Sequence, residues 1–452
     1  MCAKLFVDVT DLLEYLRQHN RPSGIQRVVF ELGQALHFAA PDRVRFVCRV
    51  GEAKDFETVT WTDIASSFSY VTTQRPPVRK TDALRTATVT PIPVGRVSLF
   101  LAIARSQADV FCQFGKLGKL LLRHVFAHRS TSEKTIADKK EGQPLAALLQ
   151  PGDMFFVPGA PWATDDYAKT VRWLRDQQRA TFSFLIHDMF PVTNPEWCDR
   201  SVIRPFTTWH RAVLPLADHI FTTSTAVARD VEAHTARERI PLQNAVTRIG
   251  AGMGFRRETT SAPTYSQHPP PRTYVLFVST IEARKNHLLM FRVWKRLMDE
   301  SNGTDVPTLV FAGRKGWLVE DLFQQLDNTR WLNGKIMHIA SPTDDELAAL
   351  YENCLFTVFP SLAEGWGLPV AESLAFGQPC LASATTAIPE AGGRFARYFD
   401  PENVADAFRV IRETLNDREG LEAWRNQIRR DFVPADWHSC ASIILSKLEP
   451  AK

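Results

Sequence analysis

Two carboxylates eight residues apart, Glu364 and Glu372, flank a glycine-rich turn within residues 358–383. This segment reads as a strand, a loop containing Gly365 and Gly367, a short helix, a glycine stop and a second strand. The free N–H groups at such a helix start bind phosphate, and each carboxylate can accept hydrogen bonds from a pair of sugar hydroxyls. Phosphate between two polyols describes a nucleotide sugar. An ordinary turn, with a glutamate favoured by the helix dipole, explains the same residues equally well.

Two adjacent cations, Arg284 and Lys285, lie in a second candidate segment, residues 279–287. They follow a predicted strand and precede a predicted helix. Strand ends of open α/β sheets face the ligand crevice, where a cation neutralises a diphosphate. Two solvated cations at a helix start are the alternative interpretation.

The elements that must position these residues alternate between strands and helices along most of the chain. In the first half, a polar loop leads to Gly24. The residues after Gly24 have apolar side chains at the spacing of one helix face, which predicts a helix. The predicted strands are residues 5–9, 44–50, 154–157, 181–186, 219–222 and 246–249, then 274–278, 308–312, 336–339 and 355–359. Helices are predicted over residues 286–297, 319–326 and 344–350. Such alternation is typical of parallel, doubly wound sheets.

A polar, proline-rich stretch at residues 256–272 divides these elements and is interpreted as a linker. The predicted organisation is a Rossmann-like domain over residues 1–255, a second one over residues 273–430, and a closing helix over residues 431–452.

Composition narrows the function classes. The chain has 452 residues, 44% of them hydrophobic and 23% charged, which suits two globular domains. A net charge of +4 with mixed signs gives no reason to expect nucleic-acid binding. Seven scattered cysteines without C-x-x-C spacing favour reduced thiols and the cytoplasm. There is no signal-peptide pattern and no apolar span long enough for a membrane helix, so we expect any membrane contact to be peripheral. No Asp-x-Asp pair or His/Cys cluster predicts a metal site.

The segment with the two glutamates resembles the donor-binding core of retaining glycosyltransferases of family 4. Residues 359–361 (Phe-Pro-Ser), 387–390 (Ala-Ile-Pro-Glu) and 396–401 (Ala-Arg-Tyr-Phe-Asp-Pro) extend the resemblance. Further matches, in the family's order, are residues 23–27, 186–188, 279–287 and 309–313. The resemblance implies the GT-B fold, an α/β architecture of two Rossmann-like, doubly wound parallel-sheet domains that face a central cleft. In that fold the terminal helix commonly crosses back to the first domain.

The resemblance also implies roles for the carboxylates and the glycine loop. Glu364 is expected to hold the transferred sugar and orient its anomeric centre, and Glu372 to bind the ribose. The backbone amides of the intervening loop are expected to contact phosphate and sugar, and they belong to Gly365, Trp366, Gly367 and Leu368.

Further roles are implied for residues outside that loop. Lys285 is expected to bind the donor phosphates and Arg284 to assist it, although Thr280 stands where the family usually has an arginine. Gly24 is expected beside the donor phosphate and sugar. His187 is expected beside the transferred sugar, with a core or capping histidine as the alternative. Arg314 is a secondary candidate, either a contact to donor phosphate or a side chain that faces water.

The implied reaction is retaining transfer of a hexosyl unit from a nucleoside-diphosphate sugar to a saccharide acceptor, with no cofactor and no metal. Family resemblance favours mannose from GDP-mannose, and a setting in bacterial surface polysaccharide assembly, lipopolysaccharide included. Two other hypotheses stay open: a GT-B nucleotide-sugar epimerase or hydrolase, and a non-catalytic GT-B subunit that binds a partner.

A basic, partly apolar insert at about residues 111–140 is not explained by the two domains. Lys116, Lys119 and Arg123 would share one face of a helix, together with apolar residues. Such a segment could rest on an anionic membrane, at the inner face of the cell membrane, and bring the cleft to a lipid-linked acceptor such as a polyprenyl-diphosphate saccharide. The alternative is a helix that packs on its own domain, with solvated cations.

Overall fold

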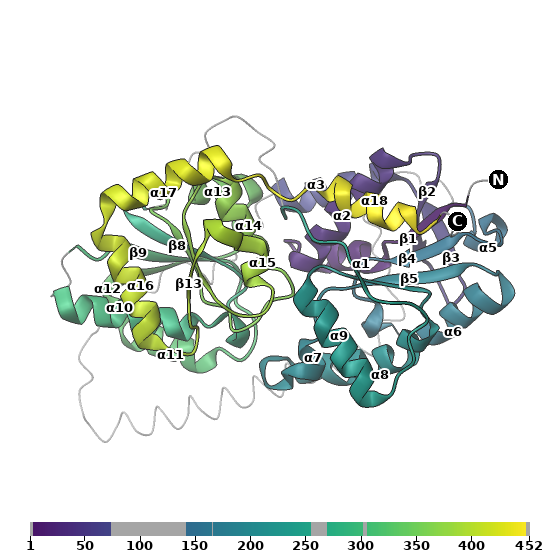
Figure 1. Ribbon diagram of the computed structural model, residues 1–452, viewed down its shortest axis with the longest axis horizontal. Helices are drawn as coiled ribbons and strands as arrows, with labels where there is room; N and C mark the ends of the chain where they lie inside the picture. The colour runs from purple at the N-terminus through teal and green to yellow at the C-terminus, as the bar shows by residue number, and fades with distance from the viewer. Residues whose placement is uncertain (1–2, 74–141, 165, 255–268, 302–304, 449–452) are drawn as a thin grey trace, which may run out of the picture. The chain divides into compact units, whose positions relative to one another are not determined.

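The structure is a computed structural model. It describes residues 3–73, 142–164, 166–254, 269–301 and 305–448. The basic insert, with Lys116, Lys119 and Arg123, and most of the predicted linker lie outside the described residues. In the described part of the chain, two sheets carry helices on their faces (Figure 1).

The first sheet has the strand order β3-β2-β1-β4-β5-β6-β7. Every pair of neighbouring strands is parallel apart from β2 and β3, which run antiparallel. Its strands are β1 (Leu5–Asp8), β2 (Val44–Arg49), β3 (Phe56–Val59), β4 (Met154–Val157), β5 (Thr181–Ile186), β6 (His219–Thr222) and β7 (Thr247–Arg248). The α-helices described in this half are α1 (Thr10–Gln18), α2 (Gly24–Ala39), α3 (Trp61–Thr73), α5 (Leu145–Leu148), α6 (Tyr167–Arg172), α7 (Phe190–Thr193), α8 (Arg200–Val213) and α9 (Thr225–Glu238).

The second sheet has the order β10-β9-β8-β11-β12-β13 and is parallel throughout. Its strands are β8 (Tyr274–Val278), β9 (Thr308–Ala312), β10 (Ile336–Ile339), β11 (Thr357–Phe359), β12 (Cys380–Ser383) and β13 (Arg397–Phe399). The helices that follow β8 are α10 (His287–Ser301), α11 (Glu320–Asn328), α12 (Arg330–Gly334), α13 (Asp344–Asn353), α14 (Leu368–Ala375), α15 (Ile388–Gly392), α16 (Val404–Asn416), α17 (Arg418–Asp431) and α18 (Trp437–Ser446).

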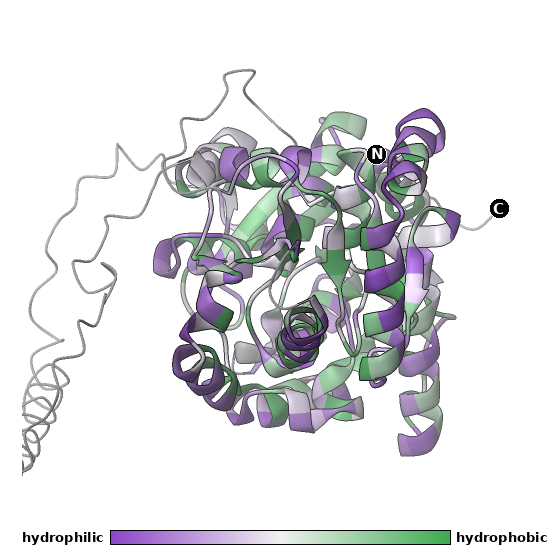
Figure 2. Ribbon diagram, turned by 90° about the vertical axis from the view of Figure 1, so that its left-hand side faces the viewer, coloured by the Kyte–Doolittle hydropathy of each residue, from purple (hydrophilic) through white to green (hydrophobic). Residues whose placement is uncertain are grey.

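The strand sequences explain this layering. β1, β4, β11 and β12 are buried along their whole length, as expected for parallel strands covered on both faces. Figure 2 shows the hydrophobic residues concentrated on strands and on the inner sides of helices, with hydrophilic residues on the outer helices. The sheets and their helices thus form the predicted doubly wound fold.

Two local predictions for the first half were incomplete. The segment between the first strand and Gly24, expected to be a polar loop, contains α1. Its Leu12 and Leu16 are one turn apart and both buried, so a narrow apolar stripe suffices to fix the helix despite its polar composition. In addition, β3 is an antiparallel edge strand, which the alternation of elements did not indicate.

Helix α18 lies against α2 of the first sheet, although it follows the second sheet in sequence (Figure 1). The Trp437 indole N–H donates to the Met253 carbonyl at 2.9 Å, which fastens the start of α18 to the first half of the chain. Among the described residues, no helix is both long and apolar enough to cross a membrane.

Candidate active site

The candidate site lies where the second sheet reverses its winding direction. β8 and β11 are neighbours, and the chain leaves them toward opposite edges of the sheet. Ligands of open α/β sheets bind at the carboxyl ends of strands at such a point. Lys285 lies in the segment after β8, and Glu364 lies in the loop after β11. The fold therefore brings together two predicted residues that are far apart in the sequence.

Glu364 is the centre of a buried ion cluster. One carboxylate oxygen, Oε1, lies 2.5 Å from the Lys285 ammonium, and Oε2 lies 2.9 Å from the Arg284 guanidinium. The Ser361 hydroxyl donates to Oε1 at 2.5 Å, and the Glu364 N–H donates to the Thr386 hydroxyl at 2.8 Å. Burial alone would raise the pKa of Glu364, but the two cations outweigh it and hold the pKa at about 2. Glu364 is therefore ionised and oriented before any ligand arrives.

Arg284 is engaged by the protein on several sides. Its guanidinium donates to the Glu282 carboxylate at 2.8 Å and to the Ala363 carbonyl at 2.6 Å, in addition to its pair with Glu364. It also lies 4.8 Å from the centre of the Phe190 ring. These contacts hold Arg284 against Glu364 from several sides.

Gly365 is required by a close approach between backbones. A Cβ atom built there would lie 1.8 Å from the His187 carbonyl oxygen, which no side chain could tolerate. The Thr223 hydroxyl, after β6, donates to the Gly365 carbonyl at 3.0 Å. Gly367 has φ +107°, a conformation that favours glycine, and it starts α14. The loop that carries Glu364 is thus fitted against strand ends of the first sheet.

His187 follows β5 and is buried, with its Nε2–H donating to the Pro158 carbonyl at 2.7 Å. Burial lowers the pKa of His187 to about 4, so its imidazole is neutral at physiological pH. Its backbone carbonyl lies against Gly365. The neutral ring can accept a hydrogen bond through Nδ1 but carries no positive charge.

Glu372 is the fifth residue of α14 and is buried. The Tyr351 hydroxyl donates to its Oε2 at 2.9 Å. Burial raises the pKa of Glu372 to about 7, although Arg27 and Tyr351 oppose the shift. Arg27, from α2, forms an ion pair with Asp344 beside it, with one guanidinium nitrogen 2.9 Å from a carboxylate oxygen. Glu372 therefore lies near a charged group of the first sheet's helices.

The remaining predicted residues, Gly24, Trp366 and Arg314, differ in burial and in their contacts. Gly24 starts α2 and is exposed, and a Cβ built there would lie 3.8 Å from Leu368. The Trp366 ring is buried, its N–H has no hydrogen-bond partner in the described part of the chain, and Arg248 lies 6.0 Å from the ring centre. Arg314 follows β9 and is partly exposed, and no ion pair within the described ranges joins it to Glu364.

Sequence reasoning missed several residues that shape the site. Ser361 and Arg27 were noted only as parts of matched segments, and Thr386, Tyr351 and Asp344 were not among the candidate site residues. Spacing could not find most of them because they approach the glutamates from elements remote in sequence: Arg27 from α2, Tyr351 and Asp344 from α13, and Thr386 from the segment after β12.

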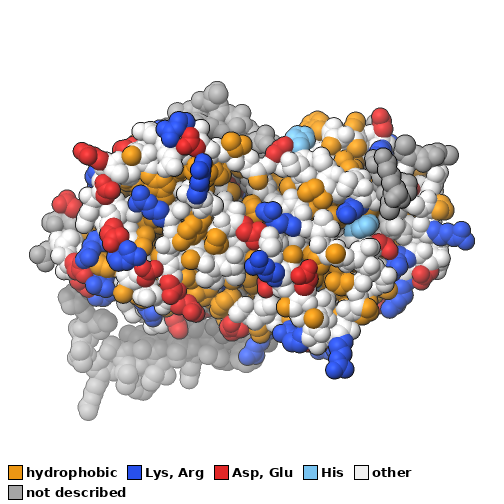
Figure 3. All heavy atoms as spheres, in the orientation of Figure 1, with side chains coloured by type: hydrophobic (Ala, Val, Ile, Leu, Met, Phe, Trp, Pro, Cys, Tyr) orange, Lys and Arg blue, Asp and Glu red, His pale blue; other side chains and the backbone are white. Residues whose placement is uncertain are grey.

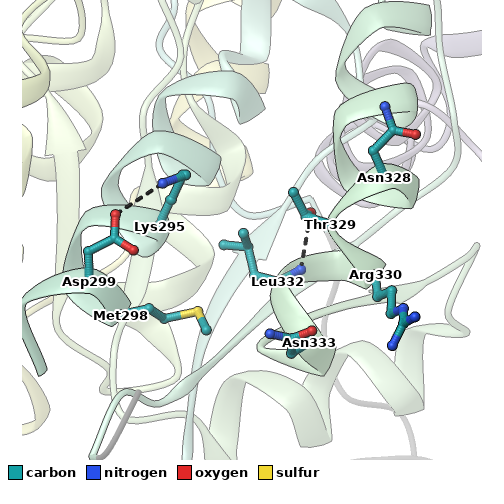
Figure 4. A pocket seen from close by; sticks show the side chains of 8 residues that line it. All are labelled: Lys295, Met298, Asp299, Asn328, Thr329, Arg330, Leu332 and Asn333. Carbon is teal, nitrogen blue, oxygen red and sulfur yellow. Dashed lines mark hydrogen bonds and ion pairs between the residues drawn. The ribbon is translucent and has the colours of Figure 1, made fainter. Parts of the chain in front are cut away.

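A pocket of about 330 Å³ lies elsewhere, between α10 and the α11–α12 segment (Figure 4). It is lined by Lys295, Met298, Asp299, Asn328, Thr329, Arg330, Leu332 and Asn333, none of which is a predicted site residue.

On the face drawn in Figure 3, basic and acidic side chains are interspersed, in keeping with the small net charge of +4. Within the described ranges, no group of three or more His, Cys, Asp or Glu residues could hold a metal ion.

Comparison with known proteins defines the class. Residues 261–431 match the family model "Glycosyl transferases group 1". The chain is similar in fold to a UDP-forming α,α-trehalose-phosphate synthase from Burkholderia xenovorans, with a TM-score of 0.50 and 15% identity over 68% of this chain and 75% of that one. The fold and the family match together define a GT-B glycosyltransferase.

Curated relatives narrow the family further. The serotype-specific mannosyltransferase WbdA of Escherichia coli is 29% identical over 242 residues, which cover 51% of this chain and 29% of that protein. The O-antigen chain mannosyltransferase B of Escherichia coli is 31% identical over 173 residues, 37% of this chain and 44% of the relative. The chain thus matches less than half the length of either relative. Residues 261–431 thus carry the match to the group 1 glycosyltransferases, and the chain is similar over part of its length to bacterial O-antigen mannosyltransferases.

Proposed function

We propose that the protein transfers a hexosyl unit, with retention of configuration, from a nucleoside-diphosphate sugar to a saccharide acceptor. The observation that carries this proposal is the buried carboxylate of Glu364, held ionised between Lys285 and Arg284 at the carboxyl ends of β8 and β11. It is an acceptor for sugar hydroxyls with a cation beside it for phosphate. Glu372, eight residues further on, supplies the second carboxylate for the ribose.

In this proposal each site residue has a distinct role. Glu364 holds the transferred sugar and orients its anomeric centre. Lys285 and the amides at the start of α14 stabilise the negative charge that develops on the leaving diphosphate. In the front-face mechanism that the family implies, the departing phosphate oxygen takes the acceptor proton while the sugar passes through an oxocarbenium-like state. No close pair of catalytic carboxylates of the retaining-glycosidase kind is needed.

We further propose mannose from GDP-mannose as the transferred unit, and a saccharide acceptor of bacterial surface polysaccharide as its destination. The names of the two Escherichia coli relatives support this choice. A nucleotide-sugar epimerase or hydrolase would use the same donor site without an acceptor, and product analysis separates them. A non-catalytic subunit is less favoured, because such a protein has no need to keep Glu364, Glu372 and Lys285 together.

Thermal-shift screening against a panel of nucleotide sugars tests the donor. A ligand at a hundred times its dissociation constant stabilises the folded state by about 2.7 kcal/mol. We expect one nucleotide sugar, GDP-mannose first, to raise the melting temperature more than its free nucleotide does. NMR of the product, formed with a tagged saccharide acceptor, then reads the anomeric configuration. A product of inverted configuration, or donor turnover that ignores the acceptor, would contradict the proposal.

The same assay in EDTA gives a second prediction. Lys285 and the helix N-terminus serve the diphosphate, so we expect transfer to persist at full rate in EDTA and to gain nothing from added magnesium or manganese. Activity that is lost on chelation and restored by a divalent ion would show that a metal takes part.

We also propose that the protein works in the cytoplasm, at the inner face of the cell membrane, through the basic insert at residues 111–140. Basic residues near an anionic surface contribute about 1 kcal/mol each. We expect co-sedimentation with vesicles containing phosphatidylglycerol, weakened by salt and reduced when Lys116, Lys119 and Arg123 are replaced by glutamate. A matched triple variant at Lys295, Arg296 and Arg409, exposed cations outside the insert, serves as the control. Equal recovery of all three proteins in the supernatant would end the proposal.

A further inference from the structure

The first sheet has its own switch point, which the donor site leaves unused. β1 and β4 are neighbours there, and the chain continues from them toward opposite edges of the sheet. The carboxyl ends of strands at such a position are where doubly wound sheets bind ligands. Asp11, the second residue of α1, follows β1, and residues 158–160 follow β4.

Asp11 is held in a fixed orientation at this point. Its Oδ2 accepts from the Gln26 side-chain amide at 2.9 Å, and the carboxylate also accepts from the Ala160 N–H. A Cβ atom built on Gly159 would lie 2.9 Å from the same Oδ2, so only glycine lets the carboxylate lie this close. Gln26 is 3% exposed and is fixed in turn by the Ser23 hydroxyl. Asp11 itself is partly exposed, so a ligand can reach it.

Tyr15 lies one helical turn beyond Asp11, on the same face of α1. Its hydroxyl is shielded from water, and the Ser23 hydroxyl, which also donates to Gln26, is a hydrogen-bonding neighbour of it. Ser23, Arg314 and Asp11 are polar neighbours close enough to influence its pKa, which burial raises. A phenol both donates and accepts, so beside a single hydroxyl neighbour Tyr15 keeps hydrogen-bonding capacity for a ligand or an ordered water.

This cluster adjoins the proposed position of the transferred sugar. The Pro158 carbonyl accepts from His187 at 2.7 Å, and two residues later the Ala160 N–H donates to Asp11. On the other side, Gly24 follows Ser23, and the Cβ position of Gly24 is 3.8 Å from Leu368 of the donor loop. One short segment after β4 therefore contacts both His187 and Asp11.

We propose that Asp11 and Tyr15 bind hydroxyl groups of the saccharide acceptor, with Gln26 as the residue that positions Asp11. The inference rests on the proposed transferase function and assigns the acceptor side of the same reaction. A carboxylate and a phenol are suitable partners for sugar hydroxyls, since one accepts and the other both donates and accepts.

The protonation of Asp11 gives this assignment a pH signature. Burial raises the pKa of Asp11 to about 6, Asp8 and Glu14 add to the shift, and the bonds from Gln26 and Ala160 oppose it. Above pH 6 the carboxylate forms charge-assisted bonds to hydroxyls. As the pH falls through 6 it becomes protonated, and these bonds weaken.

The test compares Tyr15→Phe and Asp11→Asn with wild type and with Glu14→Gln, an exposed carboxylate on the same helix. The donor is the nucleotide sugar that stabilises wild type in the thermal-shift screen, used at saturation. The acceptors are the p-nitrophenyl α-glycosides of mannose, glucose, galactose and N-acetylglucosamine. Tyr15→Phe removes a single hydroxyl and keeps the ring, so we expect the fold to persist.

We expect Asp11→Asn to raise the acceptor KM about tenfold or more, the effect of a lost hydrogen bond to a charged group. Tyr15→Phe should raise it about threefold to tenfold, the effect of a lost hydrogen bond between neutral groups. The donor KM, the melting temperature and slow donor hydrolysis in water should stay at wild-type values. Glu14→Gln should keep the wild-type acceptor KM at pH 7.5, where Asp11 is ionised in both proteins. The wild-type acceptor KM should rise between pH 7.5 and pH 5.5, and that of Asp11→Asn should not.

Two results overturn the inference in distinguishable ways. Unchanged acceptor KM values in both variants, with a transferring wild type, would reject Asp11 and Tyr15 while the proposed function stands. A wild-type protein that binds donor but transfers to none of the four glycosides would reject the proposed function and this inference with it.

Discussion

Replacing Glu364 by glutamine is expected to lower turnover on the order of a hundredfold or more. The carboxylate is the one group that two cations hold ionised at the proposed position of the anomeric centre, and the interactions of such a group strengthen as positive charge develops on the sugar. Glutamine keeps the size and the hydrogen-bonding reach of the side chain but not the charge.

The measurement is kcat at saturating donor and acceptor, with the melting temperature as a check on folding. Glu419→Gln is the matched control, because Glu419 is an exposed glutamate of the second half of the chain. A folded Glu364→Gln protein with near-normal turnover would remove Glu364 from the catalytic residues.

The second large effect is on stability and concerns Arg284→Met. Methionine has a similar length but leaves the buried carboxylates of Glu282 and Glu364 without the guanidinium they share. Breaking a buried ion pair from one side costs about 3–5 kcal/mol, so we expect the free energy of unfolding to fall by about that amount. The pKa of Glu364 should rise as well, since Arg284 is the strongest of the groups that lower it.

Urea denaturation with a tryptophan-fluorescence readout measures this loss. Arg296→Met is the control: Arg296 pairs with Glu300 at 3.0 Å on the surface, with 48% of its side chain exposed, and we expect a change within about 1 kcal/mol. If Arg284→Met were as stable as wild type, Arg284 would be a ligand-binding cation and not a support for Glu364.

The doubly wound fold could be predicted because parallel strands covered on both faces leave a clear trace in sequence. β4 (Met154–Val157) and β9 (Thr308–Ala312) are short apolar runs between helical patterns, and they were predicted at their observed bounds. The antiparallel pairing of β3 was not predictable in this way, since strand direction depends on which neighbour a strand finds. Nor was α1, whose two buried leucines are a weaker pattern than the stripe on α2.

In the candidate site too, residues within one local sequence unit were predicted, and contacts between distant segments were not. Glu364 and Glu372 are close in sequence and part of one turn-and-helix unit, so the local pattern was enough to find them. The grouping of Lys285 with Glu364 also followed from resemblance, but the support of Glu364 by Arg284 and Ser361 did not. Such roles depend on side-chain directions across elements, and a pattern of spacings carries no information about them.

The contact between Gly365 and the His187 carbonyl has a consequence for engineering. Chimeric glycosyltransferases can be designed by joining the donor-recognising half of one enzyme to the acceptor-recognising half of another. Here the donor loop meets the first sheet backbone to backbone, at a place where a single methyl group would not fit. A chimera of the two halves is therefore expected to fold only if both parents have this backbone contact. A safer design transfers the donor loop together with the segments after β5 and β6 that it contacts.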